Sequence, residues 1–434
     1  MDILSIAILI TSFFLLLAIG VPIAYSIGIS AILTMLVSIT PLPAFTTLAQ
    51  RMSTGLQSFP LLAIPFFILA GQLMNRGGIA IRLIDFARVL VGRLPGGLAF
   101  VNIMANMLFG AISGSAAASA SAIGTIMTPK MEDEGYDRSF TAAVNLSSAT
   151  TGLTIPPSNI LIVYSLASGG VSVAALFLAG YIPGILTGLS LMGVAAAMAY
   201  RRNFPPGEKT DFRTGLLKFL DAIPSLLLLV IVIGGIISGI FTATEASAVA
   251  VLYTLVLGII YGEIKLNELP DAILQAVRTS SIVLFLVATS IGLSWVMSYE
   301  NIPGEVSHVL LGLSSNKFVI LLIINLILLV VGTFMDMTPA VLIFTPIFLP
   351  VVTGPEIGLD AVHFGIILVL NLCIGLVTPP VGSLLFIGCS VADIGIEKVI
   401  KPLIPLFIAM IIVLLLVTYL PGISLWLPGI FNKL

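Results

Sequence analysis

The chain has 434 residues, of which 59% are hydrophobic and only 9% are charged. An ordinary soluble domain carries about 25% charged residues, so this chain has too few of them to cover a soluble surface. The formal net charge of -2 leaves no basic field for nucleic acid. These figures exclude a soluble enzyme, a nucleic-acid-binding protein and a disordered chain. They indicate a polytopic α-helical protein that lies in a lipid bilayer.

Apolar segments begin close to the N-terminus. No positive region or small-residue cleavage site precedes the first one, so we interpret it as a membrane span and not as a signal peptide. A span needs about 20 apolar residues. We expect spans at about 3–19, 21–38, 59–74, 139–167, 172–200, 222–240, 243–261, 280–298, 361–391 and 402–428, with an external loop at 39–58.

Two further stretches, 96–129 and 317–351, each contain a small or polar break near the middle. The breaks are SGS at 113–115 and MDMTP at 335–339. Each stretch is short for two full crossings of a bilayer. We therefore expect re-entrant hairpins, which enter and leave on the same side. Two full spans joined by a tight turn are the alternative.

Positive charge gathers on one side of this topology. Alternate loops share a side, and 15 of the 18 Lys and Arg residues lie on it. The other three are Arg51, Lys317 and Lys433. By the positive-inside rule, the basic side faces the cytoplasm and both termini are periplasmic. Two full crossings per stretch give the same count, so the charges predict sidedness and not re-entry.

The second half of the chain repeats the order of the first half in opposite orientation. Three spans, a hairpin, a broken span and a further span occupy 1–200, a polar cytoplasmic linker follows at 201–221, and the order recurs over 222–434. TIPPS at 154–158 and VTPPVGS at 377–383 mark the broken spans. Proline pairs free carbonyls that must find partners in protein, water or a bound ion. Inverted-topology repeats with broken helices are typical of secondary transporters, whose site lies at the midplane.

The first candidate site is the tip of the hairpin at 109–129, with the break at 150–159 as its partner. The small residues of this hairpin also suit ordinary helix packing. In the functional interpretation, carbonyls and hydroxyls face a sodium-like cation, and the following half-helix presents its N-terminus to an anion. The sodium candidates are Ser113, Gly114, Ser115, Thr151, Gly152, Thr154 and Pro156, and the substrate-binding candidates are Ser115, Ser158 and Asn159.

The second hairpin offers a matching arrangement. Thr338 followed by Pro339 is typical of the start of a half-helix. Asp336 lies beside this tip, and an acid within an apolar segment is a functional candidate; Glu245 is the other acid that the sequence places there. The sodium candidates here are Asp336, Thr338, Gly375, Thr378 and Pro379, and the substrate-binding candidates are Thr338, Pro339, Gly382 and Ser383.

The remaining polar residues suggest no catalytic group and no cofactor. No Lys or Arg lies clearly inside a span, so helix N-termini, hydroxyls and co-bound cations would hold an anionic substrate. Residues 77–97 predict an amphipathic helix at the inner interface. We place His308 and His363 in or near external loops and assign them no metal or relay role. Cys373 and Cys389 are interpreted as small buried hydrophobes.

Six segments spread along the chain are distinctive when they are taken together. They are LLAIPFFILAGQLMNRGGI (61–79), FGAISGSAAASASAIG (109–124), TIPPSN (154–159), LFLAGYIPGIL (176–186), TATEASAVA (242–250) and GLVTPPVG (375–382). They resemble the large membrane subunit of tripartite ATP-independent periplasmic (TRAP) transporters, the DctM/SiaM type. The resemblance covers essentially the whole chain.

The resemblance implies an elevator-type transporter of the ion-transporter superfamily fold in a bacterial inner membrane. Sodium would be the coupling ion, bound at the Ser113–Ser115 tip with the 150–159 break and at the Asp336–Thr338 tip with the 375–383 break. The resemblance also implies two partners. One is a small four-helix membrane subunit of the DctQ/SiaQ type, and the other is a periplasmic substrate-binding protein of the DctP/SiaP type.

The leading hypothesis is a sodium-coupled transporter subunit, and not an enzyme, that imports a small organic acid. Sialic acid, a C4-dicarboxylate and a sugar or keto acid all fit. No GxxxxGK[ST] loop is present, so ATP does not supply energy within this chain. The alternatives are proton coupling through Asp336 or Glu245, and a stand-alone transporter of the same superfamily. An intramembrane hydrolase lacks support, because the two acids form no paired motif and no histidine faces a serine.

Overall fold

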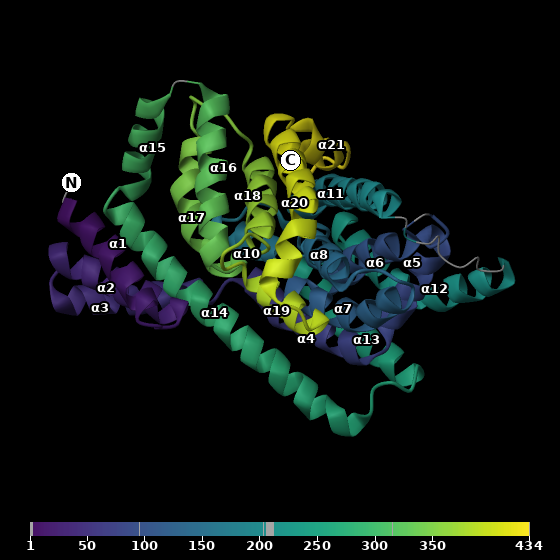
Figure 1. The fold of residues 1–434 in the computed structure, drawn as a ribbon. Coiled ribbons are helices and arrows are strands. Elements are labelled where there is room, and N and C mark those ends of the chain that lie inside the picture. The colour runs from purple at the N-terminus through teal and green to yellow at the C-terminus, as the bar shows by residue number, and fades with distance from the viewer. Residues whose placement is uncertain (1–2, 95, 203, 205–211, 315, 434) are drawn as a thin grey trace.

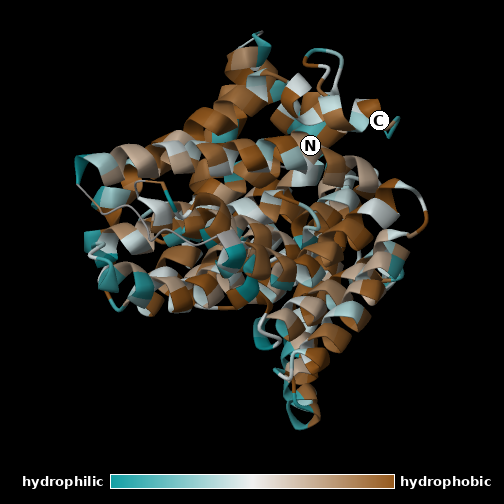
Figure 2. Cartoon of the chain, turned by 90° about the vertical axis from the view of Figure 1, so that its right-hand side faces the viewer, coloured by the Kyte–Doolittle hydropathy of each residue, from teal (hydrophilic) through white to brown (hydrophobic). Residues whose placement is uncertain are grey.

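The structure is a computed structural model that describes residues 3–94, 96–202, 204, 212–314 and 316–433. Residues 203 and 205–211 of the linker expected at 201–221 therefore lie outside the described residues, and residues 212–221 are not a linker because they form the first part of a helix that continues into the expected span. The described part is built from helices without strands, and the predicted all-α class is confirmed (Figure 1). Hydrophobic residues run along most helices, while hydrophilic ones lie mainly at turns (Figure 2). Seven of the described helices are long and apolar enough to cross a membrane.

The first half contains a hairpin, a broken span and a long helix in succession. The hairpin consists of α6 and α7, and the broken span consists of α8, the short α9 and α10. The bounds are α1 Ile3–Ala18, α2 Ile23–Ser38, α3 Pro41–Gly55, η1 Phe59–Leu62, α4 Ala63–Arg76, α5 Ile79–Val91, α6 Gly97–Ser113, α7 Ala116–Asp133, α8 Arg138–Ala149, α9 Thr151–Thr154, α10 Asn159–Ala167 and α11 Val173–Arg201.

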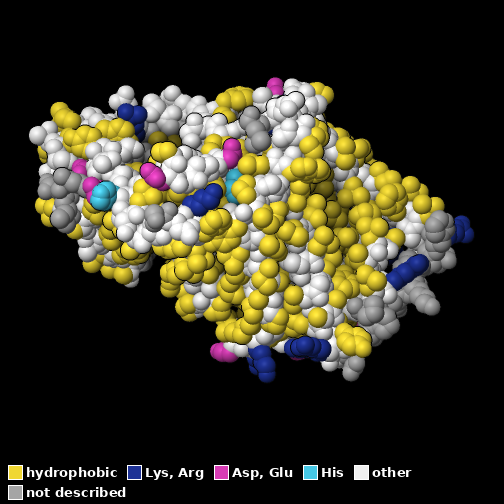
Figure 3. Space-filling view, turned by 90° about the horizontal axis from the view of Figure 1, so that it is seen from above, with side chains coloured by type: hydrophobic (Ala, Val, Ile, Leu, Met, Phe, Trp, Pro, Cys, Tyr) yellow, Lys and Arg dark blue, Asp and Glu magenta, His cyan; other side chains and the backbone are white. Residues whose placement is uncertain are grey.

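The second half has the same order, with its hairpin in α16 and α17 and its broken span in α18 and α19. The bounds are α12 Phe212–Ile237, α13 Ala243–Ile260, η2 Leu266–Glu268, α14 Leu269–Tyr299, α15 Ile302–Leu313, α16 Lys317–Phe334, α17 Met337–Thr353, α18 Ala361–Gly375, α19 Ser383–Ala392, α20 Ile396–Tyr419 and α21 Gly422–Ile430. One face of the molecule shows mainly hydrophobic side chains and few charged ones (Figure 3), as a surface against lipid requires.

Several helical segments differ from the expectation because hydropathy alone does not show amphipathic helices. The expected loop at 39–58 contains α3, in which Ala44 is the single buried residue. The long helix α14 begins well before the expected residue 280, because Asp271 and Arg278 lie on its exposed side. The last expected span, 402–428, is two helices, α20 and α21, separated at Leu420 and Pro421.

Two polar residues lie in environments that differ from those expected. His363 does not lie in a loop; it is fully buried in α18, where its Nδ1 lies 2.6 Å from Ser424 Oγ. Glu245 is exposed at the start of α13, where its carboxylate accepts a hydrogen bond of 2.8 Å from the Thr242 backbone N–H. In return, the Glu245 N–H donates to Thr242 Oγ1 at 3.2 Å. Glu245 thus completes a capping box, which explains an acid next to an apolar run.

The two broken spans lie in opposite directions. Tyr164, near the end of α10, donates a hydrogen bond of 2.5 Å to the carbonyl of Ala361, at the start of α18. At the other end, Asp137 and Ser139 at the start of α8 line one hollow together with Ile394 and Lys398, which follow α19. Each broken span therefore begins where the other one ends. This is the geometry of an inverted-topology repeat.

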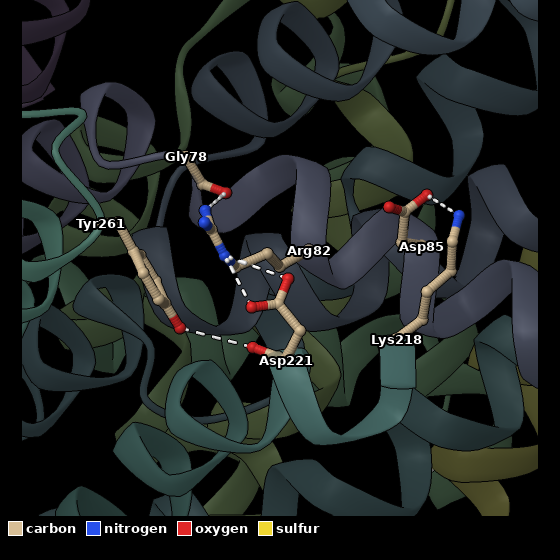
Figure 4. A network of polar contacts seen from close by, with 6 residues as sticks. All are labelled: Gly78, Arg82, Asp85, Lys218, Asp221 and Tyr261. Carbon is tan, nitrogen blue, oxygen red and sulfur yellow. Dashed lines mark hydrogen bonds and ion pairs between the residues drawn. The ribbon is translucent and has the colours of Figure 1, made fainter. Parts of the chain in front are cut away.

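A network of ion pairs connects the two halves near the basic loops. Arg82 of α5 lies 3.3 Å from Asp221 of α12, and its guanidinium lies 3.5 Å from the ring centre of Tyr261 (Figure 4). On the same pair of helices, Asp85 lies 3.1 Å from Lys218. The expected amphipathic helix is thus present as α5, and its charged side chains fix it to α12.

Paired glycines bring each hairpin close to its broken span. A Cβ added to Gly152 of α9 would lie 2.3 Å from the Cα of Gly110 in α6. A Cβ added to Gly375 of α18 would lie 2.6 Å from the Cα of Gly332 in α16. Gly152 and Gly375 both precede a proline pair by the same number of residues. The two repeats therefore use one packing device, the close approach that small residues allow between membrane helices.

We predict that Gly375→Ala lowers the melting temperature of the purified protein, because the added methyl group overlaps the backbone of α16. Overpacking of this kind costs about 1–3 kcal/mol. Gly193→Ala in α11 is the matched control, since nothing lies within 4 Å of the added Cβ. Thermal unfolding in detergent measures both variants. A Gly375→Ala protein as stable as Gly193→Ala would contradict the close packing.

Candidate functional site

Both hairpin tips meet at one cavity of about 220 Å³. One tip contributes residues of the turn between α6 and α7, and the other contributes the start of α17. The starts of α10 and α19, at the two breaks, complete this side, while α4 and α14 close the opposite side. On the side of the tips and breaks, the lining includes Gly114, Ser115, Asn159, Asp336, Thr338 and Ser383. On the opposite side it includes Ile64, Ile68, Thr279 and Val283.

The first tip lies halfway along the neighbouring broken span. A Cβ added to Gly114 would lie 2.8 Å from Asn159 Nδ2, and Asn159 follows the break between α8 and α10. Each of these two helices is too short to cross a bilayer alone. The hairpin therefore turns back at mid-depth, which supports the re-entrant form over two full crossings.

Four helix N-termini converge on this cavity. The N-cap residues are Ser115 for α7, Ser158 for α10, Asp336 for α17 and Gly382 for α19. Each of the four helices has its N-cap or first residue in the lining. The first backbone N–H groups of a helix lack intrahelical partners and carry a partial positive charge. The cavity can therefore attract an anion through backbone groups alone.

Asp336 is the single charged side chain among the described residues that line the cavity. No Lys, Arg or His belongs to this described lining. The described part of the chain also has no group of three or more His, Cys, Asp or Glu that could hold a metal ion. An anionic ligand would thus lie near a carboxylate with no side-chain cation beside it.

The first break offers oxygen atoms in a buried setting. All residues from 150 to 158 are buried. Thr151 donates a hydrogen bond of 2.6 Å to the Ser148 carbonyl, and Ser158 donates one to the Leu153 carbonyl. A hydroxyl that donates its proton in this way keeps its lone pairs for a cation. The helices α6 and α9 also end at this break and at the neighbouring tip, and their C-terminal carbonyls bear a partial negative charge.

The second break is more open than the first. Thr378 donates a hydrogen bond of 2.7 Å to the Ile374 carbonyl, but its side chain is only half-buried. Pro380 and Ser383 are exposed. The Gly382 N–H donates to the Thr333 carbonyl at 3.0 Å, which connects this break to the hairpin helix α16. Carbonyl and hydroxyl oxygens are therefore present at both breaks, but those of the second break are more exposed to the surroundings.

The residues predicted from the sequence fall into two sets. Those that line the cavity are Gly114, Ser115, Asn159, Asp336, Thr338 and Ser383. Those that belong to the tips and breaks but not to the lining are Ser113, Thr151, Gly152, Thr154, Pro156, Ser158, Pro339, Gly375, Thr378, Pro379 and Gly382. The ligand roles given to both sets stay predictions. Sequence reasoning missed Ile64, Ile68, Thr279 and Val283, because residues of these types within long spans carry no local signal.

Buried amides hold each hairpin against its broken span. In the first repeat, Asn106 Nδ2 donates to Asn145 Oδ1 at 3.0 Å and to Ser148 Oγ at 2.9 Å. In the second repeat, Asn371 Nδ2 donates to Asn325 Oδ1 at 2.9 Å. Such bonds fix the relative position of the helices, because an unpaired buried amide is costly. Sequence reasoning missed this network as well, although polar residues within apolar helices are its signal.

The first break touches the second broken span through Cys373 of α18. Its thiol donates a hydrogen bond of 3.4 Å to the Thr150 carbonyl, and its sulfur lies 3.9 Å from Thr154 Oγ1. Cys373 is fully buried, as expected for a small hydrophobe. The thiol also has a polar partner that the sequence did not reveal. The hairpins and broken spans thus form one packed unit.

An all-helical fold of inverted repeats, with broken helices around a shared cavity, defines a membrane protein of the secondary-transporter type. The family model described as "Tripartite ATP-independent periplasmic transporter, DctM component" matches residues 10–423. The chain therefore belongs to the DctM family, the large permease components of TRAP transporters for organic acids, and it is not an enzyme.

Relatives and a solved structure agree with this assignment. The chain is 58% identical to protein YgiK of Salmonella typhimurium over 98% of both chains. It is 39% identical to the C4-dicarboxylate TRAP transporter large permease protein DctM of Pseudomonas aeruginosa, over 93% of this chain and 94% of that one. It is 38% identical to the sialic acid TRAP transporter large permease protein SiaM of Vibrio cholerae, over 96% of each. The crystal structure of the Alcanivorax borkumensis YdaH transporter shares the fold, with a TM-score of 0.66 over 87% of this chain and 88% of that one, at 13% identity.

We predict that Gly114→Ala destabilises the protein more than Gly135→Ala does. Both glycines have a positive φ, +61° and +85°, where alanine is strained by about 1–2 kcal/mol. Nothing lies within 4 Å of a Cβ added to Gly135, whereas one added to Gly114 would meet Asn159 Nδ2. The difference in melting temperature therefore reports the contact at the tip. Asn159→Ala in the Gly114→Ala background should recover part of the loss, and equal losses in the two single variants would argue against this contact.

Proposed function

We propose that this chain is the large membrane subunit of a sodium-coupled TRAP importer of a small organic acid. Charge balance at the cavity carries the proposal. Asp336 is exposed in the cavity. An organic anion would bind beside it in a site whose described lining has no side-chain cation, and two like charges a few ångströms apart repel each other more strongly in a protein than in bulk water. Cations bound at the two breaks would restore the balance. Coupling of substrate to cation then follows, because each binds poorly without the other.

The groups at the breaks favour sodium as that cation. They are backbone carbonyls and the hydroxyls of Thr151, Ser158 and Thr378, with Asp336 as the single carboxylate nearby. Oxygen ligands without thiolates or imidazoles suit a hard cation. Most of these groups do not titrate near neutral pH, so a proton-coupled mechanism would depend on Asp336. Glu245 is less suited to carry a proton, because it is exposed and engaged in a capping box.

The packed unit of hairpins and broken spans is the moving part in the proposed elevator mechanism. Glycine pairs, buried amides and the Cys373 contact hold this unit together internally. Its contact with α4 is also close: a Cβ added to Gly71 would lie 3.0 Å from the Ser113 carbonyl at the first tip. The unit would move past α4 and α14 and carry the cavity with it.

The size of the cavity favours a small acid. A volume of 220 Å³ corresponds to about seven waters at ~30 Å³ each. A C4-dicarboxylate has a similar number of heavy atoms, as does a small keto acid, whereas sialic acid is much larger. Relatives are named for C4-dicarboxylates and for sialic acid. Among these, we propose the smaller class for this chain.

The arrangement in the membrane follows from the charge distribution and the family. We assign residues 1–200 and 212–434 to two inverted repeats joined by a short cytoplasmic linker. The basic side would face the cytoplasm of a bacterial cell, with both termini periplasmic. A tripartite system implies a small membrane subunit of the DctQ/SiaQ type and a periplasmic binding protein of the DctP/SiaP type that delivers the acid.

We predict that Thr378→Val raises the sodium concentration needed for half-maximal uptake by about tenfold, the effect of losing one interaction with a charge. Thr353→Val is the matched control. The Thr353 hydroxyl also donates a hydrogen bond of 2.7 Å to the carbonyl four residues earlier, but Thr353 is exposed at the far end of α17, away from the breaks. Uptake of radiolabelled C4-dicarboxylates and keto acids into proteoliposomes with both partner proteins measures the effect. An equal shift in the two variants would mean that Thr378 has no special role.

We also predict that a sodium gradient drives uptake and that a pH gradient alone does not. Asp336→Asn should then keep uptake sodium-driven but require more sodium, because the amide retains an oxygen and loses the charge. Wild-type uptake driven by a pH gradient without sodium, and lost in Asp336→Asn, would favour proton coupling instead. Omitting the binding protein and the small subunit tests the stand-alone alternative, in which uptake would persist.

A further inference from the structure

A second, larger cavity of about 460 Å³ lies near the end of α14 that is remote from the basic loops. It is bounded by the end of α3, the end of α10, the outer half of α14 and the middle of α17. Its polar lining residues are Thr54, Gln57, Ser58, Ser290 and Ser294. No charged side chain belongs to its described lining.

Both cavities open on the same face of α14. Thr279 and Val283 line the midplane cavity, and Ser290 and Ser294 line the outer one. Residues eleven positions apart complete about three helical turns, so they share a face and lie about 16 Å apart along the axis. The buried residue Val287 lies between the two pairs. The helices α10 and α17 also contribute to both cavities. The outer cavity therefore lies at the same helix interface as the midplane site, about 16 Å further along α14.

Ser290 indicates that the outer cavity takes a polar ligand. Its side chain is only 2% exposed, and its Oγ has no hydrogen-bond partner among the described residues. Thr279, Ser281 and Ser298 of α14 donate to the carbonyl four residues earlier, whereas Ser280 shares the unpartnered state of Ser290 but does not line this cavity. A buried hydroxyl without a partner costs about 1–3 kcal/mol. A ligand with a hydrogen-bonding oxygen would satisfy it.

Arg51 is a cationic side chain close to this cavity, although it does not belong to the lining. It lies one helical turn before Thr54 on α3, and its guanidinium lies 5.7 Å from the ring centre of Trp295, the neighbour of Ser294. The side chain is exposed and forms no ion pair with another described residue. A guanidinium in this position can bind a carboxylate through two parallel hydrogen bonds.

We propose that the outer cavity is a second binding site for the transported acid, occupied before the midplane site. Arg51 binds the carboxylate beside the cavity, and Ser290 bonds a hydroxyl or keto oxygen within it. The ligand class is a small hydroxy- or keto-carboxylate. This inference rests on the proposed function and on the proposed orientation, in which this end of α14 faces the periplasm.

Reaction with charged thiol reagents tests the site in right-side-out membrane vesicles that contain the full chain. Ser290→Cys introduces the target, and the unsubstituted chain is treated in parallel to subtract any reaction of Cys373 and Cys389, which are about as buried as Ser290. The anionic reagent sulfonatoethyl methanethiosulfonate should react faster than its trimethylammonium counterpart. Arg51→Gln should reduce this preference about tenfold, as loss of a local field does, while Arg51→Lys should retain most of it. Ser298→Cys, exposed on the same helix, is the accessibility control.

Binding is tested by protection with malate, pyruvate and gluconate. At least one acid should slow the reaction of Ser290→Cys about tenfold, leave Ser298→Cys unaffected and lose its effect in Arg51→Gln. The proposal is overturned if none protects, if Arg51→Gln leaves the charge preference unchanged, or if Ser298→Cys reacts and Ser290→Cys does not. Ser294→Cys probes the same cavity if Ser290→Cys fails to reach the membrane. Protection at this site without any sodium-driven uptake would refute the proposed function and leave the outer site standing.

Discussion

Backbone groups at the broken ends of helices cannot stay unpaired inside a membrane, and the arrangement of this protein depends on where those ends are gathered. The proline pairs and the two hairpin turns create free amides and free carbonyls at mid-depth. The amides of α7, α10, α17 and α19 converge on one cavity, and the carbonyl ends of α6, α9, α16 and α18 belong to the same tips and breaks. In the proposed function, the same interruptions thus provide a surface for an anion and, next to it, places for cations. No basic side chain is needed in the cavity.

The sequence allowed these interruptions to be predicted because proline pairs and polar residues are conspicuous within apolar runs. Asp336, Thr338 and Asn159, named from such local signals, all line the cavity. Other features depend on contacts between distant segments and have no local signal. Ile64 and Thr279 face the cavity only because α4 and α14 pack opposite the hairpins, and Gly110 matters only because Gly152 lies against it. The helix α3 and the start of α14 were missed because their polar residues resemble a loop to a hydropathy pattern.

The two repeats are similar in chain order but not in environment. The first break is covered by α11, which approaches so closely that a Cβ added to Gly180 would lie 2.3 Å from the Thr154 carbonyl. The second break leaves Pro380 and Ser383 exposed. A cation at the first break would be shielded from water, while one at the second would stay in contact with its surroundings. Equivalent sequence motifs therefore do not imply equivalent exchange of a bound ion.

The contact of Cys373 with Thr150 has a consequence for the energetics of binding. Because this contact joins the backbone of the first break to a side chain of the second broken span, a shift of either broken span changes the contact. A ligand that reshapes one break must then change the free energy of binding at the other. Thermodynamic reciprocity requires the second ligand to exert an equal effect in return. A single sulfur atom at the contact between the two repeats would thus couple the occupancy of the two halves.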